Sequence, residues 1–195
     1  MRHGATVWNG EGRWQGWTDM PLGEVGERQA ERLARRLAGT DPGTVYASDL
    51  QRAADTARLA LPGHPLTLDV RLRELNFGRY EGRTTDEVRH DPEYAEWQRD
   101  PWTLPAPGGG ESLRGVAARL RSWAEELPAG TVTAFTHGAA VRALLCDLFG
   151  WPAPPQPGYV LPFPYRLAHT GLTRLTREAG RWILLTYNDH AHLEV

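Results

Sequence analysis

Short segments that favour β-strands alternate with longer amphipathic segments that favour helices along most of this chain. Strand candidates lie at 44–47, 65–70 and 131–136, helix candidates lie at 21–37, 113–127 and 139–149, and two more strands lie at 170–176 and 182–187 around a predicted hairpin turn. In the helix candidates, apolar residues recur at every third or fourth position. This order favours an α/β fold: a three-layer α/β/α sandwich with a mostly parallel central sheet, helices on both faces and an antiparallel pair at the end.

The size and charge of the chain limit the classes of protein it can belong to. Its 195 residues suit a single domain, 1–195, with a small excursion at about 83–107. The 22 basic and 24 acidic side chains leave a net charge of -2 without a basic stripe, so we expect neither nucleic acid nor membrane as a partner. The lone Cys146 lies in an apolar helical run and is expected to be buried. A disulfide framework is therefore excluded, and we expect a cytoplasmic protein.

A capping-box pattern predicts the start of one helix beside a charged side chain. Ser48 and Gln51 have Ser-x-x-Gln spacing, so we expect a helix that begins at Ser48 and carries Arg52 in its first turn. A cation in that turn opposes the helix dipole. An anionic ligand near Arg52 is therefore favoured over a simple surface cation.

The region between the second and third strand candidates has less regular patterning. Thr84 and Glu87 repeat the capping-box spacing and predict a short helical stretch that is interrupted at Pro92. The charged and tryptophan-rich residues that follow, up to Pro107, are interpreted as an excursion over a site. A later run, 152–164, is rich in proline and is predicted to be a loop, because proline cannot complete a regular ladder.

Groups that bind and attack phosphate lie at the ends of three predicted strands. One strand ends in Arg2-His3-Gly4, another leads into Ser48 and Arg52, and a third ends in Thr136-His137-Gly138. Ligands of open α/β sheets bind at the carboxyl ends of the strands, so we expect these groups to meet. Guanidinium groups bind phosphoryl oxygens, and a neutral imidazole can attack phosphorus. Glu74, in a loop after another strand, would supply a proton.

The ordered motifs around these groups resemble the histidine phosphatase superfamily, also called phosphoglycerate-mutase-like. The resemblance covers nearly the whole chain, and the fixed order of its motifs makes it specific. In chain order the motifs are Arg2-His3-Gly4, Thr6 with Trp8-Asn9, Gly12-Arg13 with Gln15-Gly16, Ser48-Asp49-Leu50 with Arg52-Ala53, Glu74 with Gly78, Pro107-Gly108-Gly109 with Glu111-Ser112, and Thr136-His137-Gly138 with Arg142.

The resemblance implies a role for each matching residue. His3 would be the nucleophile that forms a phosphohistidine. The residues that would hold the phosphoryl oxygens are Arg2, Arg52 and His137, with Asn9 and the backbone of Gly138. Glu74 would protonate the leaving oxygen and then, as a carboxylate, activate water. The resemblance implies no metal and no other cofactor, because the arginines and His137 supply the positive charge that a metal would bring.

Three functions are compatible with such a site. Hydrolysis is favoured, because the mutases of the family are longer and carry an insertion after the acid, whereas the stretch from Glu74 to Pro107 is short here. The first alternative is a cofactor-dependent phosphoglycerate mutase. The second, from another class, is a non-catalytic module that binds a phosphorylated ligand, and the intact set of chemical positions argues against it. The expected partner is a small phosphorylated metabolite, either α-ribazole 5′-phosphate or a broad range of phosphomonoesters, and a homodimer is one alternative for the oligomeric state.

Substrate contacts beyond the phosphate are predicted for Gln15, Phe77, Trp97 and Trp102. The aromatic side chains have two interpretations, which are stacking on a base or sugar and packing within the excursion. Neither interpretation is excluded by the sequence.

The remaining histidines are expected to be structural or exposed. His190 and His192 have the alternate-residue spacing of a metal pair, but no third ligand accompanies them, so a structural role is favoured. His64, His90 and His169 are interpreted as surface or structural residues.

The start of the chain departs from the family pattern. An apolar strand of several residues precedes the Arg-His-Gly motif in the family, whereas only Met1 precedes Arg2 here. We therefore expect the natural protein to carry additional apolar residues upstream.

Overall fold

Parallel strands form the centre of the protein, as predicted. The computed structural model describes residues 1–150 and 166–194, and the predicted proline-rich loop at 152–164 lies outside them. The strands β1 (Thr44–Ala47), β2 (Leu66–Leu68) and β3 (Val132–Phe135) are parallel and lie in the order β2-β1-β3. Arg2 extends this sheet through a parallel bridge to Thr136. The first residues of the chain therefore lie beside the carboxyl end of β3.

The predicted antiparallel pair is also present. Strands β4 (Leu172–Glu178) and β5 (Arg181–Asp189) pair with each other. Ala179 and Gly180 connect them with φ values of 47° and 77°, and two positive φ angles are the geometry of a two-residue type I′ turn. The N–H of Arg2 lies 3.3 Å from the carbonyl oxygen of Gly171, so the chain start bridges β3 and the beginning of this hairpin.

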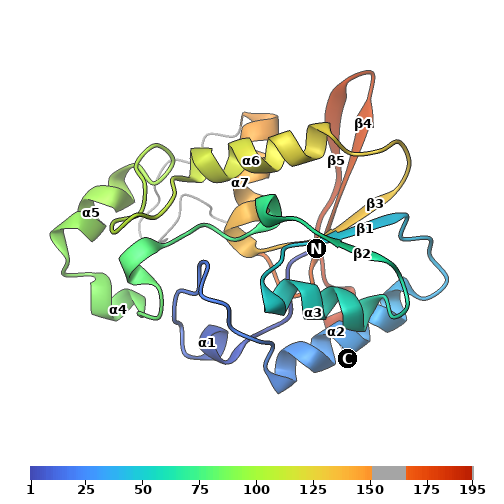
Figure 1. Cartoon of the computed structure of the whole chain (residues 1–195), viewed down its shortest axis with the longest axis horizontal. Coiled ribbons are helices and arrows are strands. Elements are labelled where there is room, and N and C mark those ends of the chain that lie inside the picture. The colour runs from blue at the N-terminus through green and yellow to red at the C-terminus, as the bar shows by residue number, and fades with distance from the viewer. Residues whose placement is uncertain (151–165, 195) are drawn as a thin grey trace.

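Helices cover both faces of the sheet, which confirms the layered α/β arrangement. Helices α2 (Glu24–Leu37) and α3 (Gln51–Ala60) pack together on one side, and α6 (Leu113–Glu125) and α7 (Gly138–Phe149) pack together on the other (Figure 1). The buried residues of α2, Gly26, Ala30 and Leu33, recur at helical spacing, as expected for an amphipathic surface helix.

Shorter helices complete the described part of the chain. The α-helices are α1 (Val7–Gly10), α4 (Thr85–Val88) and α5 (Pro92–Arg99), and single 3₁₀ turns lie at Val70–Leu72, Gly78–Tyr80 and Ala191–Leu193. Within residues 1–150 and 166–194, no helix combines the length and apolar character that a bilayer crossing requires. Cys146 is buried, as predicted.

The predicted start of α3 at Ser48 is wrong, although Arg52 does lie in its first turn. The helix begins at Gln51, and the hydroxyl of Ser48 accepts a hydrogen bond from the N–H of Leu50 at 3.3 Å instead of capping the helix. The N–H of Gln51 donates to Asp19 Oδ1 at 2.7 Å. A carboxylate from a distant loop therefore supplies the acceptor that the local pattern assigned to Ser48.

In the excursion one capping prediction is confirmed and one interpretation is corrected. The Thr84 hydroxyl accepts from the N–H of Glu87 and the Glu87 side chain accepts from the N–H of Thr84, which is a complete capping box for α4. Pro92 does not interrupt a helix, because it is the first residue of α5, with Asp91 as N-cap. The first helical position has no intrahelical acceptor for its N–H, so proline costs nothing there.

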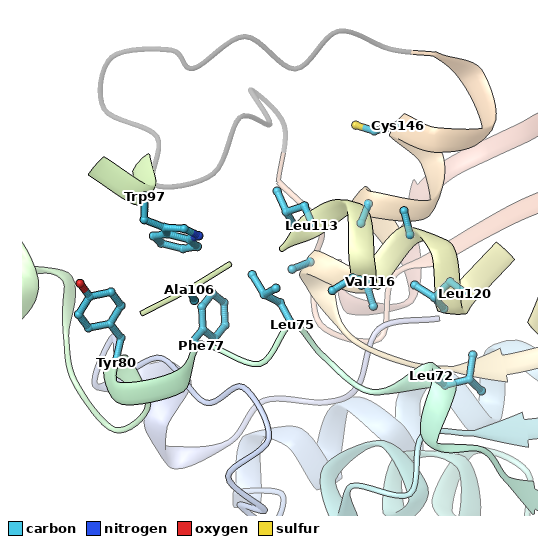
Figure 2. Close-up of a cluster of buried hydrophobic side chains, with 14 of the residues drawn as sticks. Leu72, Leu75, Phe77, Tyr80, Trp97, Ala106, Leu113, Val116, Leu120 and Cys146 are labelled. Carbon is cyan, nitrogen blue, oxygen red and sulfur yellow. The ribbon is translucent and has the colours of Figure 1, made fainter. Parts of the chain in front are cut away.

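An aromatic cluster anchors the excursion to the body of the protein. We use this name for Trp14, Phe77, Tyr80, Tyr94 and Trp97. The ring centroids of contacting pairs lie between 4.7 and 6.4 Å apart, mostly edge to face. Figure 2 shows Phe77, Tyr80 and Trp97 continuing the line of buried side chains that α6 contributes. The side chains of Tyr94 and Trp97 in the excursion therefore belong to the same hydrophobic core as those of α6.

Candidate functional site

The backbone around His3 fixes both the position and the tautomer of its imidazole. The N–H of His3 donates to the carbonyl oxygen of Thr136 at 2.9 Å, which ties this residue to the end of β3. His3 is 3% exposed, and its Nδ1 lies 2.6 Å from the carbonyl oxygen of Gly4. A carbonyl oxygen can only accept, so Nδ1 carries the proton and Nε2 retains its lone pair. The imidazole is thus set to act as a nucleophile through Nε2.

Gly4 is required by the close approach of a second segment. A Cβ atom at Gly4 would lie 2.6 Å from the carbonyl oxygen of Gly26, in the first turns of α2. No other side chain fits this contact without moving the backbone. The carbonyl of Gly4 that holds the His3 ring is therefore itself fixed against α2.

His137 lies next to His3 and makes no hydrogen bond through its side chain among the described residues. It is the N-cap residue of α7, is fully buried, and its ring centroid lies 5.1 Å from that of His3. Burial, followed by the charge of Arg52, lowers the pKa of His137 well below its usual range, and burial and Arg52 act on the pKa of His3 in the same way. Both imidazoles are therefore neutral at neutral pH.

Arg2 and Arg52 bring two positive charges to the same place. Arg52 is fully buried and donates through its two Nη atoms to the carbonyl oxygens of Thr18 at 3.0 Å and Gly16 at 2.7 Å. Arg2 donates to the carbonyl oxygen of Leu167. Burial lowers the pKa of each guanidinium to about 10, so both stay charged at neutral pH.

Neither guanidinium has its charge neutralised by direct contact. Within the part of the chain that the structure describes, Arg2 and Arg52 form no ion pair with a carboxylate, and the Nε atom of each is buried without a partner. Buried cations are normally paired, because a desolvated charge is costly. An anion with several oxygen acceptors would supply the missing partners.

Glu74 lies at the start of the helix that carries His137. Its carboxylate accepts from the N–H groups of Ala139 at 3.2 Å and Ala140 at 3.1 Å, and from its neighbour Leu75 at 2.9 Å. The first N–H groups of a helix lack intrahelical acceptors, so this carboxylate occupies a natural anion position. Glu74 and His137 are consequently held by one element, α7.

The loop that carries Glu74 is held by two residues for which the sequence interpretation had no role. The carbonyl oxygen of Glu74 accepts from Trp17 Nε1 and from Arg119 Nη2, both at 2.8 Å. Arg119 also donates to the carbonyl oxygen of Arg73 at 2.7 Å and to Glu111 Oε1 at 3.0 Å. These bonds join residues far apart in the chain, and no local pattern indicates them.

Asn9 lies in α1, and Gly138 opens α7 next to Arg2. The Asn9 Oδ1 accepts from the N–H of Thr6 at 3.0 Å in the capping box of α1, which leaves the amide NH₂ to donate elsewhere. Gly138 is the first residue of α7, and a Cβ atom there would lie 3.5 Å from Arg2 Nε. The roles predicted for both residues are proposals that this arrangement allows.

The predicted substrate contacts fall into two groups. Gln15 is buried next to Gly16, and its Oε1 has no partner among the described residues, so a contact with a ligand stays a prediction. Trp97 is 1% exposed and Phe77 is 9% exposed, both inside the aromatic cluster. Both rings pack within this cluster, which favours the packing interpretation, and a contact with the substrate stays a prediction for these two residues. Trp102 is half-buried against the same core.

The structure adds a third imidazole, His169, that the sequence interpretation left outside the site. Its ring centroid lies 5.8 Å from that of His3, and its Nε2 is buried without a partner among the described residues. Burial, followed by the charge of Arg2, lowers the pKa of His169 to about 3. No motif marks this residue, because it reaches the site only through the packing of the chain before β4.

The histidine pair near the end of the chain has local partners. His190 Nδ1 lies 2.7 Å from the carbonyl oxygen of Asn188, and His192 Nε2 lies 2.9 Å from the hydroxyl of Thr170. In the described ranges, no cluster of three or more His, Cys, Asp or Glu residues is arranged to hold a metal ion. These contacts fit the structural role favoured for the pair.

Comparison with known proteins places this arrangement in a family. The family model described as "Histidine phosphatase superfamily (branch 1)" matches residues 1–190. The probable phosphoglycerate mutase GpmB of Yersinia pestis is 33% identical over 212 aligned positions, which cover 100% of this chain and 94% of the relative.

Solved structures with the same architecture include two phosphatases. The mycobacterial glucosyl-3-phosphoglycerate phosphatase in complex with VO3 has a TM-score of 0.82 and 33% identity, with 96% of each chain covered. A mutant phosphoserine phosphatase of Entamoeba histolytica in complex with phosphoserine has a TM-score of 0.85 and 27% identity, with 98% of this chain and 96% of that chain covered.

Proposed function

Because the chain belongs to the histidine phosphatase superfamily and is a phosphatase, we propose that it hydrolyses a small phosphorylated metabolite, without a metal ion, through a phosphohistidine on His3. The observation that carries this proposal is the hydrogen bond from His3 Nδ1 to the Gly4 carbonyl oxygen, 2.6 Å long. It presents the Nε2 lone pair beside the buried Arg52 and the half-buried Arg2, which form no ion pair with a carboxylate among the described residues.

In the first step, His3 Nε2 attacks phosphorus and the bond from phosphorus to the leaving oxygen breaks. The carboxyl group of Glu74 donates its proton to that oxygen, so the product leaves as an alcohol. Arg2 and Arg52 stabilise the negative charge on the remaining phosphoryl oxygens, and the neutral His137 contributes an N–H donor. A phosphohistidine remains on the enzyme.

In the second step, the Glu74 carboxylate takes a proton from water, and the water oxygen attacks phosphorus. The phosphorus–nitrogen bond breaks, its electron pair returns to His3 Nε2, and orthophosphate leaves. Glu74 ends protonated, ready for the next cycle. The three N–H donors around its carboxylate, from Leu75, Ala139 and Ala140, keep it in place through both steps.

The identity of the substrate and the physiological setting are part of the proposal. The named relatives act on different phosphorylated compounds, so their names do not single out one substrate. We propose a small metabolite, with α-ribazole 5′-phosphate or a broad range of phosphomonoesters as candidates, and a cytoplasmic enzyme. A homodimer stays a prediction.

Phosphate release from a panel of esters tests this function. The panel contains an aryl phosphate, phosphoserine, α-ribazole 5′-phosphate, glucosyl-3-phosphoglycerate and 3-phosphoglycerate, each assayed with and without bisphosphoglycerate. We expect hydrolysis without priming, and loss of the rate by a factor on the order of 10³ or more in His3→Ala. The control His64→Ala, at an exposed position, is expected to behave as the original protein.

Two outcomes would replace the proposal. Interconversion of phosphoglycerates that depends on bisphosphoglycerate would establish the mutase alternative, which the relatedness to GpmB motivates. Tight binding of phosphate esters without turnover of any panel member would establish the non-catalytic module.

A further inference from the structure

The segment that precedes β4 is fastened to the strand that carries the nucleophile. The N–H of Thr170 donates to the carbonyl oxygen of Arg2 at 3.0 Å and lies 3.3 Å from that of His3. In return, the N–H of Arg2 lies 3.3 Å from the carbonyl oxygen of Gly171, and the Arg2 guanidinium donates to the carbonyl oxygen of Leu167. The backbone on both sides of His169 is thereby tied to the phosphate-binding motif.

The conformation of Thr170 indicates that this attachment is maintained against strain. Thr170 has a φ of 58°, is β-branched and is fully buried. Such residues rarely adopt left-handed φ values, and they persist where the surroundings impose them, most often at functional sites. Thr170 directly follows His169, whose ring lies next to that of His3.

The His169 imidazole carries a polar atom that no protein group in the described ranges satisfies. This atom, Nε2, is buried, although buried polar atoms are normally hydrogen-bonded. The nearby charge is that of Arg2, a cation, which cannot accept a hydrogen bond. The ring centroids of His169 and His3 lie 5.8 Å apart, so the imidazole that carries this atom lies next to the ring of the nucleophile.

The charge state of His169 fits a donor. With its pKa lowered to about 3 by burial, the imidazole is neutral at neutral pH and has one N–H to give. A neutral donor holds an anionic oxygen without adding a further cation to a site that already contains Arg2 and Arg52.

We propose that His169 is a further phosphoryl-binding residue, which donates an N–H from Nε2 to a non-bridging oxygen of the substrate and of the orthophosphate product. This rests on the proposed function, because the ligand is the phosphoryl group transferred to His3. The competing explanation is that the His169 ring acts as a wedge, which means that it only packs against the His3 ring and fixes its orientation.

Two substitutions separate a donor from a wedge. His169→Gln keeps a donor near the position of Nε2 and loses the ring, whereas His169→Phe keeps a ring and loses the donor. His64→Gln, at an exposed position, is the matched control. The readouts are the Kd of orthophosphate by calorimetry, kcat and KM on an aryl phosphate, and the thermal midpoint of each variant.

A donor role predicts a distinct pattern. His169→Phe is expected to weaken phosphate binding about 10- to 100-fold, as for loss of one hydrogen bond to a charged group, while its thermal midpoint is unchanged or higher. His169→Gln is expected to bind phosphate within about threefold of the original protein. KM is expected to follow the phosphate Kd in both variants.

Other patterns overturn the inference. Phosphate binding by His169→Phe at the original affinity would exclude the contact, and weaker binding by His169→Gln together with unchanged binding by His169→Phe would assign the effect to ring shape. If His169→Phe does not fold, His169→Leu replaces it with the same expectation. Phosphate binding does not require turnover, so a protein that binds phosphate but hydrolyses no ester would fail the proposed function while leaving this inference testable.

Discussion

The site around His3 and the aromatic cluster are both buried, and the sequence suggested ligand contact for both. They differ in the chemistry of the buried polar atoms that lack a hydrogen-bond partner. Around His3 these atoms belong to two guanidinium groups and two imidazoles, which lie next to one another. In the aromatic cluster, Trp97 Nε1 is a single neutral atom without a partner among rings. Convergent positive charge without a carboxylate in direct contact therefore marks a ligand site, and an isolated polar atom among aromatic rings does not.

The same contrast separates the buried Arg52 from the half-buried Arg119. Arg119 donates to backbone carbonyls and also pairs with Glu111 at 3.0 Å, so its charge is used within the protein. Arg52 donates to two carbonyls but pairs with no carboxylate in the described residues. Arg119 therefore supports the loop of Glu74, whereas the charge of Arg52 remains for a ligand.

The largest effect, after loss of the nucleophile itself, is expected for Glu74→Gln. Glutamine keeps the shape of the side chain and one oxygen that can accept from the N–H of Ala140, so the fold should be kept, but it can neither protonate the leaving oxygen nor activate water. We expect kcat on an alkyl phosphate to fall about 10²- to 10⁴-fold.

The choice of leaving group sharpens the Glu74 test. With p-nitrophenyl phosphate, whose leaving group needs no proton, stopped-flow measurement should show a retained first-turnover burst followed by slow steady state. Glu31→Gln, at an exposed position on α2, is the control. An unchanged steady-state rate in Glu74→Gln would remove Glu74 from the mechanism.

A smaller loss of activity is expected for Arg52→Lys. If this variant keeps full activity, the contrast between Arg52 and Arg119 does not hold. Lysine keeps the charge but loses the planar fork, which donates to both carbonyls and is proposed to bind phosphoryl oxygens. We expect kcat/KM to fall about 10²- to 10³-fold, measured together with the thermal midpoint.

Arg119→Lys is the matched variant, and it is expected to affect stability more than activity. Arg119→Lys loses hydrogen bonds to the backbone around Glu74. We therefore expect it to lower the thermal midpoint more than Arg52→Lys does, and to weaken orthophosphate binding less. Equal effects of both substitutions on phosphate affinity would mean that ion pairing does not distinguish ligand-binding from supporting arginines here.

The sequence predicted those parts of the fold that depend on local periodicity. The sequence predicted the amphipathic spacing of α2 and α6. It also predicted that α7 stops at Gly150, which has a left-handed φ of 59°. The site residues that lie in ordered motifs, such as His3 and His137, could also be identified from the sequence. Both kinds of signal are carried by neighbours in the chain.

What the sequence did not reveal depends on distant contacts. The N–H of Gln51 is capped by Asp19, 32 residues earlier, so the local Ser48 pattern pointed to the wrong helix start. The burial of Trp97 depends on Phe77 and α6, and local composition cannot distinguish a packed indole from an exposed one. His169 reaches His3 only through backbone bonds of Thr170 to Arg2 and His3.

Trp97→Ala tests whether the aromatic cluster is purely structural. Removing a large buried ring should lower the free energy of unfolding by about 3–5 kcal/mol, measured by urea denaturation. Assayed well below the thermal midpoint, kcat/KM for an aryl phosphate should stay within about threefold of the original, because Trp97 is 1% exposed. A large and selective loss on aryl over alkyl esters would return Trp97 to the substrate site.

The smallest effect concerns pH and separates the two regions without changing the substrate. The pKa of His169 is lowered to about 3 in the folded protein, below the ordinary value of 6.5, so the unfolded chain binds more protons between these values. Its contribution to stability is complete above pH 6.5 and is lost as the pH falls toward 3, by roughly 2 kcal/mol between pH 6.5 and 5. His169→Gln should therefore flatten the dependence of the free energy of unfolding on pH in this window, whereas Trp97→Ala should lower that free energy equally at every pH. Urea denaturation of both variants at several pH values compares the two, and parallel curves for His169→Gln and the original protein would mean that His169 is not held neutral beside Arg2.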